Sequence, residues 1–250
     1  DNKNAWFSRS WTSLVFLMFK LVSLASISVF LNCLLAFELR DELETNSFLT
    51  EPSFNYFDSN QRITLTGETA SSHNGSEYLI KKPKLRIKND TYSSYIEALE
   101  GELNRTSKLI NFRNSVTFYT KLREEILIES EELSFNLNNQ KLKSEVSVFT
   151  TLKGVNISSL GLDVVQDVDG IKAEFNKGRI KIKDEEIYHN GYANKITIFS
   201  ELNELIMEGE AYIDQDGFII KSEKIHYDLE ENKIMKSINS TIESSRWIFL

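Results

Sequence analysis

The sequence contains very few of the residues that mark several protein classes. It has one cysteine, Cys33, so no intramolecular disulfide can form, and the small secreted folds that disulfides stabilise are excluded. Only two prolines, Pro52 and Pro83, and ten glycines occur in 250 residues, which argues against collagen-like, low-complexity and linker-rich chains. With 41% hydrophobic residues the chain can bury a core, and its length fits one or two domains.

Signatures of catalysis are also missing. The three histidines, His73, His189 and His226, are far apart, and none belongs to an HExxH motif, a nucleophile elbow or a zinc-spaced cluster. The sequence has no P-loop and no GxGxxG motif. We therefore expect each histidine at a surface or turn position, and we expect no catalytic residue, metal site or cofactor.

The charge is acidic and unevenly distributed. The formal net charge is −8, and because residues 1–20 carry +2, the remainder carries −10. So acidic a surface repels phosphate backbones, and the sequence offers no basic stripe interleaved with aromatic residues. We therefore expect no nucleic-acid partner.

An apolar stretch near the N-terminus has the length of a membrane span. Residues 14–37 are interrupted by one charge, Lys20, and residues 21–37 are free of charge. As a helix, the stretch would extend about 36 Å and could cross a hydrocarbon core of about 30 Å. A cleaved signal peptide is the alternative, but its apolar region is normally shorter, and FELRDELE follows here instead of a small-x-small site. The sequence predicts a retained transmembrane helix.

The flanking charges indicate how this helix is oriented. Three cations and one carboxylate lie within the first twenty residues, whereas carboxylates dominate the segment from Glu38 to Glu44. The positive side normally stays in the cytoplasm. We expect residues 1–13 to be a short cytoplasmic N-terminus, residues 38–54 to be a linker, and the C-terminal domain to face outward.

Beyond the linker, apolar and polar residues alternate as in half-buried β-strands. No long amphipathic helix intervenes, although residues 91–103 fit either a short helix or a strand. The clearest alternating segments are 115–119, 126–128, 133–137, 145–149, 179–183 and 195–199. An all-β domain is predicted.

Alternation places a set of apolar residues on one face of these strands. The set is Val116, Phe118, Ile126, Ile128, Leu133, Phe135, Leu137, Val146 and Val148. Such a face can fill an ordinary dry core, or it can line an open trough that binds lipid. Periodicity does not separate these two possibilities.

An internal repeat in the sequence adds further residues to the expected inward face. Residues 109–148 resemble residues 205–242 nearly element for element, with Ile126-Leu127-Ile128 parallel to Phe218-Ile219-Ile220. One β-structural unit is therefore used at least twice, and stacked units of this kind give an elongated structure with open ends. The inward positions expected in the second copy are Ile213, Phe218, Ile220, Ile225 and Tyr227.

The motifs of the second copy resemble those of a known family. Glu208-Gly-Glu-Ala-Tyr-Ile213, Gly217 and Ile225-His-Tyr-Asp228 resemble the repeat of the OstA-like (LptA-like) lipopolysaccharide transport proteins. The front half, with Phe57-Asp-Ser59 and the following ITLTGETA, resembles the LptC family. The resemblance implies an open, taco-like antiparallel β-jellyroll with one N-terminal transmembrane helix. Residues 55–190 would be LptC-like, and residues 191–250 would add an OstA-like unit to the same sheet.

The resemblance also implies a function. The protein would be an inner-membrane, periplasm-facing component of the lipopolysaccharide export bridge. It would receive lipopolysaccharide from an inner-membrane ABC transporter and bind it on the inward face. An LptA-like bridge protein would then join by strand addition at an open sheet edge. Two alternatives remain: a membrane-tethered adhesion ectodomain, and a scaffold of the same fold whose interior is closed and carries no lipid.

Overall fold

The computed structural model describes residues 47–58, 61–88, 93–121, 125–152, 154–166, 171–184, 187–200, 202–215 and 217–244. The segments 1–13 and 14–37, predicted to be cytoplasmic and transmembrane, lie outside the described residues. In the part of the chain that is described, no helix is long and apolar enough to cross a membrane. Residues from Ser47 onward belong to one compact unit, and only this unit is considered below.

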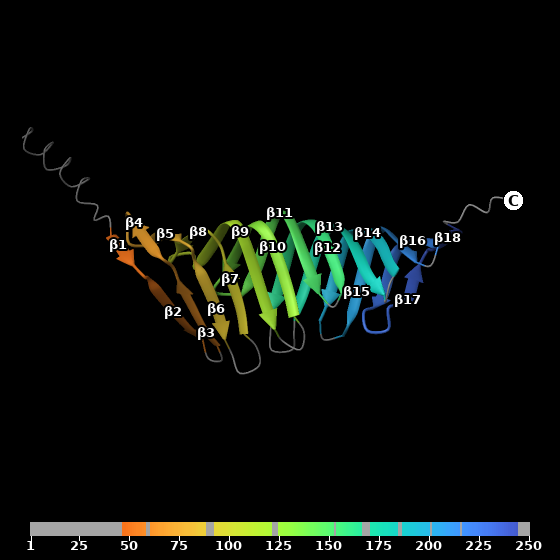
Figure 1. Ribbon diagram of the computed structural model, residues 1–250, viewed down its shortest axis with the longest axis horizontal. Coiled ribbons are helices and arrows are strands. Elements are labelled where there is room, and N and C mark those ends of the chain that lie inside the picture. Colours follow the sequence, from red (N-terminus) through yellow and green to blue (C-terminus); the bar gives the residue numbers. More distant parts are fainter. Residues whose placement is uncertain are drawn as a thin grey trace, which may run out of the picture. The chain divides into compact units, whose positions relative to one another are not determined.

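This unit is an open antiparallel β-sheet, which confirms the expected all-β class. Its strands follow one another from β1 at one end to β17 and β18 at the other (Figure 1). The short strands at the beginning are β1 (Ser47–Thr50), β2 (Ser53–Asp58), β3 (Gln61–Thr66), β4 (Thr69–Ser72), β5 (Glu77–Lys81), β6 (Lys84–Lys88), β7 (Ser93–Glu97) and β8 (Glu100–Asn104). The long strands are β9 (Leu109–Lys121), β10 (Glu125–Asn136), β11 (Lys141–Leu152), β12 (Val155–Gln166), β13 (Ile171–Asp184), β14 (Ile187–Phe199), β15 (Glu204–Gln215) and β16 (Phe218–Asp228), followed by the short β17 (Lys233–Ile238) and β18 (Thr241–Ser244).

The short strands are long strands interrupted at their middle. Only two residues separate β1 from β2, β3 from β4, β5 from β6 and β7 from β8. Each pair therefore forms one ribbon of the same length as β9 or β10. The ribbons beginning with β5, β7, β9, β10 and β11 start at residues 77, 93, 109, 125 and 141, which is one ribbon every 16 residues. The repeat found in the sequence is a multiple of this unit.

Every ribbon crosses between two walls of the sheet. One wall, here called wall A, pairs β1, β4, β5 and β8 with the first half of β9 and ends at β17. The other wall, wall B, pairs β2, β3, β6 and β7 with the second half of β9 and ends at β18. The long strands β9 to β16 run through both walls, so the sheet is folded along a line through their middles.

Register shifts and small side chains produce this fold line. Ladder pairing shifts between Ser130 and Glu132 in β10 and between Ser144 and Ser147 in β11, as expected for β-bulges that bend a strand. The Ser130 and Ser144 hydroxyls lie 3.3 Å apart, and Ser130 also donates to the carbonyl of Ser147 at 3.1 Å. In β12 the bend falls at Gly161, whose φ of +90° suits a residue without a Cβ.

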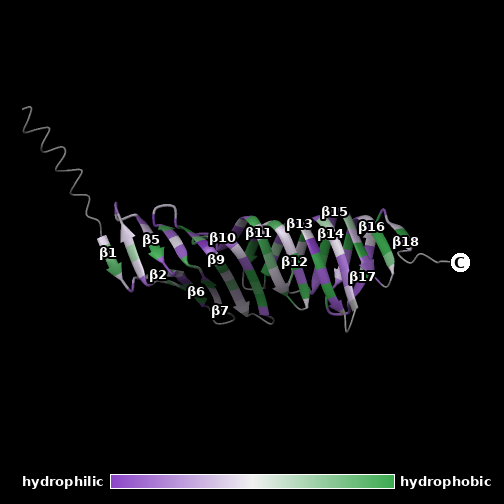
Figure 2. Ribbon diagram, turned by 45° about the horizontal axis from the view of Figure 1, so that its top comes forward, coloured by the Kyte–Doolittle hydropathy of each residue, from purple (hydrophilic) through white to green (hydrophobic). Residues whose placement is uncertain are grey.

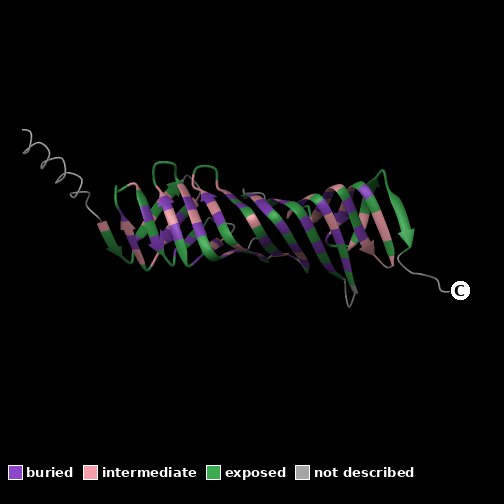
Figure 3. Ribbon diagram, turned by 90° about the horizontal axis from the view of Figure 1, so that it is seen from above, coloured by how far each residue is buried: buried purple, intermediate pink, exposed green. Residues whose placement is uncertain are grey.

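Alternation within each ribbon builds the core between the walls. Buried and exposed bands alternate along the strands, and hydrophobic and hydrophilic bands do the same (Figures 2 and 3). In β5 and β6, for example, the pattern is exposed-buried-exposed-buried-exposed. The apolar side chains of both walls thus face one interior and form one buried cluster.

The structure refines three expectations about the elements. Segments 126–128 and 133–137 largely belong to one strand, β10. They look separate in the sequence because the bulge between them shifts the inward positions from even to odd residue numbers. Segment 91–103 contains the strands β7 and β8 where it is described, and no helix. Among the described residues, strand β1 already begins at Ser47, inside the range 38–54 that was predicted to be a linker.

Candidate functional site: the apolar interior between two walls

Most of the residues expected to face inward lie between the walls. The ones that are buried are Val116, Phe118, Ile126, Ile128, Leu133, Phe135, Val148, Ile213, Ile225 and Tyr227. Leu137 and Ile220 are partly buried and pack against this cluster. Register explains the grouping, since Phe118 lies opposite Ile128 on wall B and Phe135 lies opposite Ile110 on wall A.

Two residues of the expected set depart from it. Val146 is only half-buried, because it falls inside the β11 bulge where pairing shifts from Ser144 to Ser147. Phe218 is 51% exposed, because it begins β16 at the end of the sheet, where its ladder neighbour is Ser244 of the short β18. Both residues keep the phase of the inner series of their strands, but neither is buried.

The interior is longer than the residues singled out from the sequence. Both the first third and the middle of the domain contribute buried side chains that were not assigned to the inward face. The largest are Leu65, Leu85, Ile96, Leu103, Ile110, Phe112, Ile157, Leu162 and Phe175. The sequence does indicate these inward positions, because the segments QRITLT and KLRIK alternate between apolar and polar residues in the same way as the assigned strands.

Aromatic side chains close the interior at its N-terminal end. The rings of Phe54 from wall B and Tyr78 from wall A meet edge to face, with centroids 5.0 Å apart. Burial raises the pKa of the neighbouring Tyr56, and the positive charge of Arg105 partly opposes this shift. The walls therefore touch at this end.

At the C-terminal end an apolar side chain of wall B is exposed. Ile220 pairs with Ile242 across β16 and β18, and the Ile242 side chain is 68% exposed. At the same end, the side-chain amide of Gln215 donates to the backbone carbonyl of Asn232 at 3.4 Å. Gln215 ends β15 in wall B and Asn232 lies in the turn before β17 in wall A, so this contact joins the walls.

The histidines do not assemble into a catalytic group. His73 lies in a turn and is exposed. His189 is buried in β14, which corrects the expectation of a surface position, because it shares the inner face with Gly191 and Ala193. His226 lies on the outer side of β16, with Nδ1 2.5 Å from Oε1 of Glu204. Among the described residues, no cluster of histidine, cysteine and carboxylate side chains could hold a metal ion.

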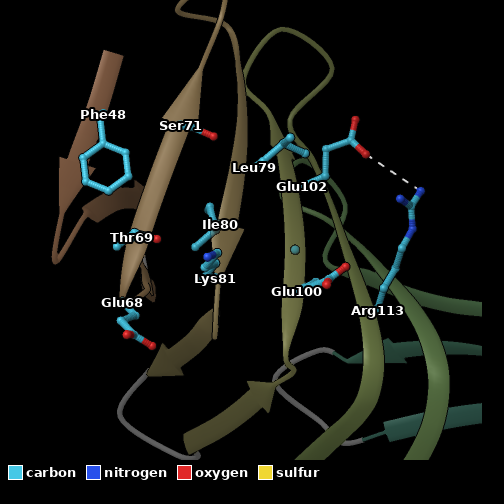
Figure 4. Close-up of a pocket in the computed structure, with 11 residues that line it drawn as sticks. Phe48, Glu68, Thr69, Ser71, Leu79, Ile80, Lys81, Glu100, Glu102 and Arg113 are labelled. Atoms are coloured by element: carbon cyan, nitrogen blue, oxygen red, sulfur yellow. Dashed lines mark ion pairs between the residues drawn. The ribbon is translucent and has the colours of Figure 1, made fainter. Parts of the chain in front are cut away.

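The outer face of wall A carries paired charges and an open groove. Glu174 lies between Lys172 at 2.7 Å and Lys195 at 3.0 Å, and hydrogen bonds from these ammonium groups lower the pKa of its carboxyl. A groove of about 400 Å³ crosses β1, β4, β5 and β8, lined by the exposed Phe48 and Leu79 and bordered by the Glu102–Arg113 ion pair (Figure 4). This groove lies outside the apolar interior.

The fold and the site define a class: an open antiparallel β-sheet folded around a continuous apolar interior. A comparison with protein families matches residues 95–233 to the family described as LptA/(LptD N-terminal domain) LPS transport protein. The chain belongs to this family of lipopolysaccharide transport proteins. The OstA-like part of the expectation is thereby confirmed, whereas the match is not specific to LptC.

Solved structures provide a further similarity. The chain matches the crystal structure of LptH from Pseudomonas aeruginosa, described as the LptA-homologous periplasmic component of the lipopolysaccharide transport device. The two are 13% identical with a TM-score of 0.36, and the match covers 60% of this chain and 93% of LptH. A comparison with curated proteins gives no match.

Proposed function

We propose that this protein is a membrane-anchored periplasmic component of the lipopolysaccharide export bridge. It accepts lipopolysaccharide from an inner-membrane ABC transporter and passes it along the interior between walls A and B. Residues 14–37 supply the anchor, residues 55–190 form an LptC-like part, and residues 191–250 lengthen the conduit. No covalent chemistry is required, because transfer depends on burial of acyl chains in an apolar interior.

The single observation that carries this proposal is the continuity of the apolar interior. Its inner side chains extend from Phe54 in β2 to Ile225 and Tyr227 in β16 without a break in the buried cluster. Acyl chains need such a surface shielded from water, and the polar saccharide can stay solvated where the turns of the two walls face each other. Membership of a lipopolysaccharide transport family supports the same role.

Open sheet edges support assembly with an LptA-like protein. Among the described residues, β1 pairs only with β4 and β2 only with β3, while β17 and β18 each pair only with β16. Each end therefore offers unpaired backbone groups to a strand of another protein. Main-chain hydrogen bonds would supply affinity, and alternating side chains would set the register.

Photo-crosslinking tests the conduit. A photoreactive amino acid replaces Phe118, Phe135 or Tyr227 on the inner face, and Thr117 or Asn136 at neighbouring positions serves as the matched control. In cells that make lipopolysaccharide, we expect ATP-dependent glycolipid adducts at the three inner positions and none at the controls. Equal yields at inner and control positions in folded, membrane-assembled protein would reject the conduit.

A scaffold without cargo is the second candidate, and the close burial of the interior favours it. Side chains such as Ile96, Phe112 and Phe175 are fully buried, so the walls would have to separate before acyl chains could enter. In a scaffold, none of the photoreactive positions would yield a glycolipid adduct, while protein partners would still co-purify.

A further inference from the structure

Carboxylates pair with cations on the outer faces of both walls, as Lys84 and Glu97 do at 3.1 Å on wall B. On wall A, Lys141 pairs with Asp163 at 2.9 Å, and other lysines pair in the same way with Glu174 and Glu208. On the outer face of wall B, Arg62, Arg86 and Lys88 have no carboxylate partner among the described residues. This group, here called the basic cluster, lies on β3 and β6.

Register forces the members of the basic cluster together. Arg62 lies directly opposite Lys88, and Arg86 lies opposite Thr64 two residues further along the same pair of strands. Like charges directly opposite each other destabilise a sheet, and no described carboxylate relieves this repulsion. In a chain of net charge −8, these three neighbouring cations form a local positive patch that an anion would stabilise.

The cluster forms a concave site. A pocket of about 310 Å³ is lined by Arg62, Thr64, Arg86 and Lys88. Two guanidinium groups, one ammonium group and the Thr64 side chain thus surround a volume large enough for a small anion. The Thr64 hydroxyl donates to Oδ1 of Asn55 at 3.0 Å, so it is a fixed part of the wall.

Aromatic rings hold both guanidinium groups in place. Cζ of Arg62 lies 5.6 Å from the ring centroid of Phe57, and Cζ of Arg86 lies 5.5 Å from that of Tyr95. The Tyr95 hydroxyl accepts a hydrogen bond from Ser93 at 3.0 Å. A guanidinium over a ring keeps its N–H groups available at the edge, and this planar fork matches phosphate oxygens.

The lowered pKa of Tyr95 agrees with a positive potential at the cluster. The hydrogen bond from Ser93 lowers the pKa of the Tyr95 hydroxyl, and the charges of Arg86 and Lys88 lower it further. The same potential would favour any anion that enters the pocket.

We propose that the basic cluster is a phosphate-binding site on the outer face of wall B. Arg62 and Arg86 donate paired N–H groups to phosphate oxygens, and Lys88 adds a point charge. The phosphate can belong to a lipid headgroup or can be free in solution, because the chemistry that the site recognises is the same. The site lies on the opposite side of the sheet from the apolar interior, so it is independent of the proposed conduit.

Binding of inorganic pyrophosphate to the full chain in nonionic detergent micelles tests the site by calorimetry. The variant R62Q/R86Q/K88Q should weaken binding at least tenfold. The control K141Q/K172Q/K195Q changes the net charge equally on wall A and should bind within about twofold of the natural protein. The charge-preserving R62K/R86K should bind several-fold more weakly, because lysine lacks the guanidinium fork.

A second arm identifies the source of the phosphate. Hydrogen exchange of residues 61–66 and 84–88 is compared in micelles with and without phosphatidylglycerol. Protection by phosphatidylglycerol without pyrophosphate binding assigns the site to lipid headgroups, and binding of both ligands shows that phosphate alone suffices. Either result supports the proposal if the R62Q/R86Q/K88Q variant abolishes it.

Three results would overturn the proposal: equal binding by natural and R62Q/R86Q/K88Q protein, binding of neither ligand, or association of this face only with acidic polypeptide. Misfolding is a poor explanation for lost binding, because removing Arg62–Lys88 repulsion should leave the urea midpoint unchanged or raise it. That midpoint is measured on every variant.

Discussion

Phe175 illustrates how a single inner side chain supports this fold. It is fully buried in β13, lies opposite Leu162 of β12 and Ile196 of β14, and belongs to the cluster that joins both walls. Phe149 in β11 is the matched outer residue, since 43% of it remains exposed. The two positions separate the effect of burial from that of the aromatic side chain itself.

We predict that Phe175→Ala lowers the free energy of unfolding by about 3–5 kcal/mol, because it removes buried apolar area and leaves a cavity. The control Phe149→Ala should cost less than about 1 kcal/mol. Urea denaturation of the full chain, followed by circular dichroism, measures both. Equal losses at the two positions would show that the interior is not the source of stability.

Sequence reasoning succeeds for residues wherever alternation is uninterrupted. Phe118, Ile128 and Phe135 were placed correctly, because each lies within a regular half of its strand. Val146 keeps the inward phase of Ser144 and Val148 but is only half-buried, because it lies in the β11 bulge, where the ladder is interrupted. His189 was wrongly expected at the surface, because the expectation was based on the polarity of histidine and not on its inward position in the alternating series of β14.

At the scale of elements, the fold line was the feature that sequence reasoning missed. Alternation identified β9 to β11, but it divided β10 into two strands at its bulge. The missing signal is a change in the alternating series near small residues such as Ser130 and Ser144. These serines satisfy backbone groups that the bulge leaves unpaired, which single-strand periodicity does not encode.

The last bend depends on one hydroxyl. Ser222 Oγ donates toward the Ile238 carbonyl at 2.5 Å and accepts from the Ile238 amide at 3.1 Å, so it fastens β17 to β16. We predict that Ser222→Ala leaves these groups unsatisfied at a local cost of about 1–3 kcal/mol. Hydrogen exchange should accelerate over residues 233–244 and stay unchanged in β10 to β12. Ser240→Ala removes an exposed hydroxyl at the same end and should have little effect; unchanged exchange in Ser222→Ala would contradict the role of this hydroxyl.

The wall A ion pairs predict a pH dependence. Because Lys172 and Lys195 lower the pKa of Glu174 in the folded state, its pairs stabilise the protein above the unfolded value, about 4.3. This stabilisation disappears as the pH falls through the lowered folded pKa. We predict that Glu174→Gln lowers stability at pH 7 by less than about 1 kcal/mol and that the difference vanishes in acid.

Urea midpoints measured between pH 7 and pH 3.5 test this prediction. Glu129→Gln is the control, because Glu129 is an exposed carboxylate on wall B with no ion-pair partner in the described part of the chain. Its midpoint at pH 7 should stay close to that of the natural protein. A Glu174→Gln difference that grows in acid would have the wrong sign for the proposed pairing.

At the scale of the whole molecule, the proposed assembly depends on the two ends of the sheet. Ile242 is an exposed apolar residue on β18, the last strand of wall B. We predict that Ile242→Lys weakens capture of an LptA-like strand partner at least tenfold without lowering the unfolding midpoint, because charged side chains protect edge strands from pairing. Thr241→Lys adds the same charge at the neighbouring position and should weaken capture much less. Equal effects of both lysines in a pull-down would indicate general charge repulsion instead.

The class of fold and the family were accessible from sequence, because repeated alternation specifies stacked strands however weak each strand signal is. The basic cluster was not, since Arg62 and Lys88 are 26 positions apart and meet only through the pairing of β3 with β6. The negative net charge of the whole chain even suggested that no such group of cations would be found. Finding such a cluster requires the cross-strand register, which composition does not contain.

Because the ribbons repeat about every 16 residues, the number of ribbons sets the length of the sheet. Each ribbon adds the same cross-section and about 4.8 Å of length, the spacing between paired strands. A change of length that keeps both ends intact must come in pairs of ribbons, about 32 residues at a time, because one extra ribbon would reverse the direction in which every later strand crosses from wall to wall. Relatives of this chain should therefore differ in reach by whole hairpins, each worth about 9.6 Å.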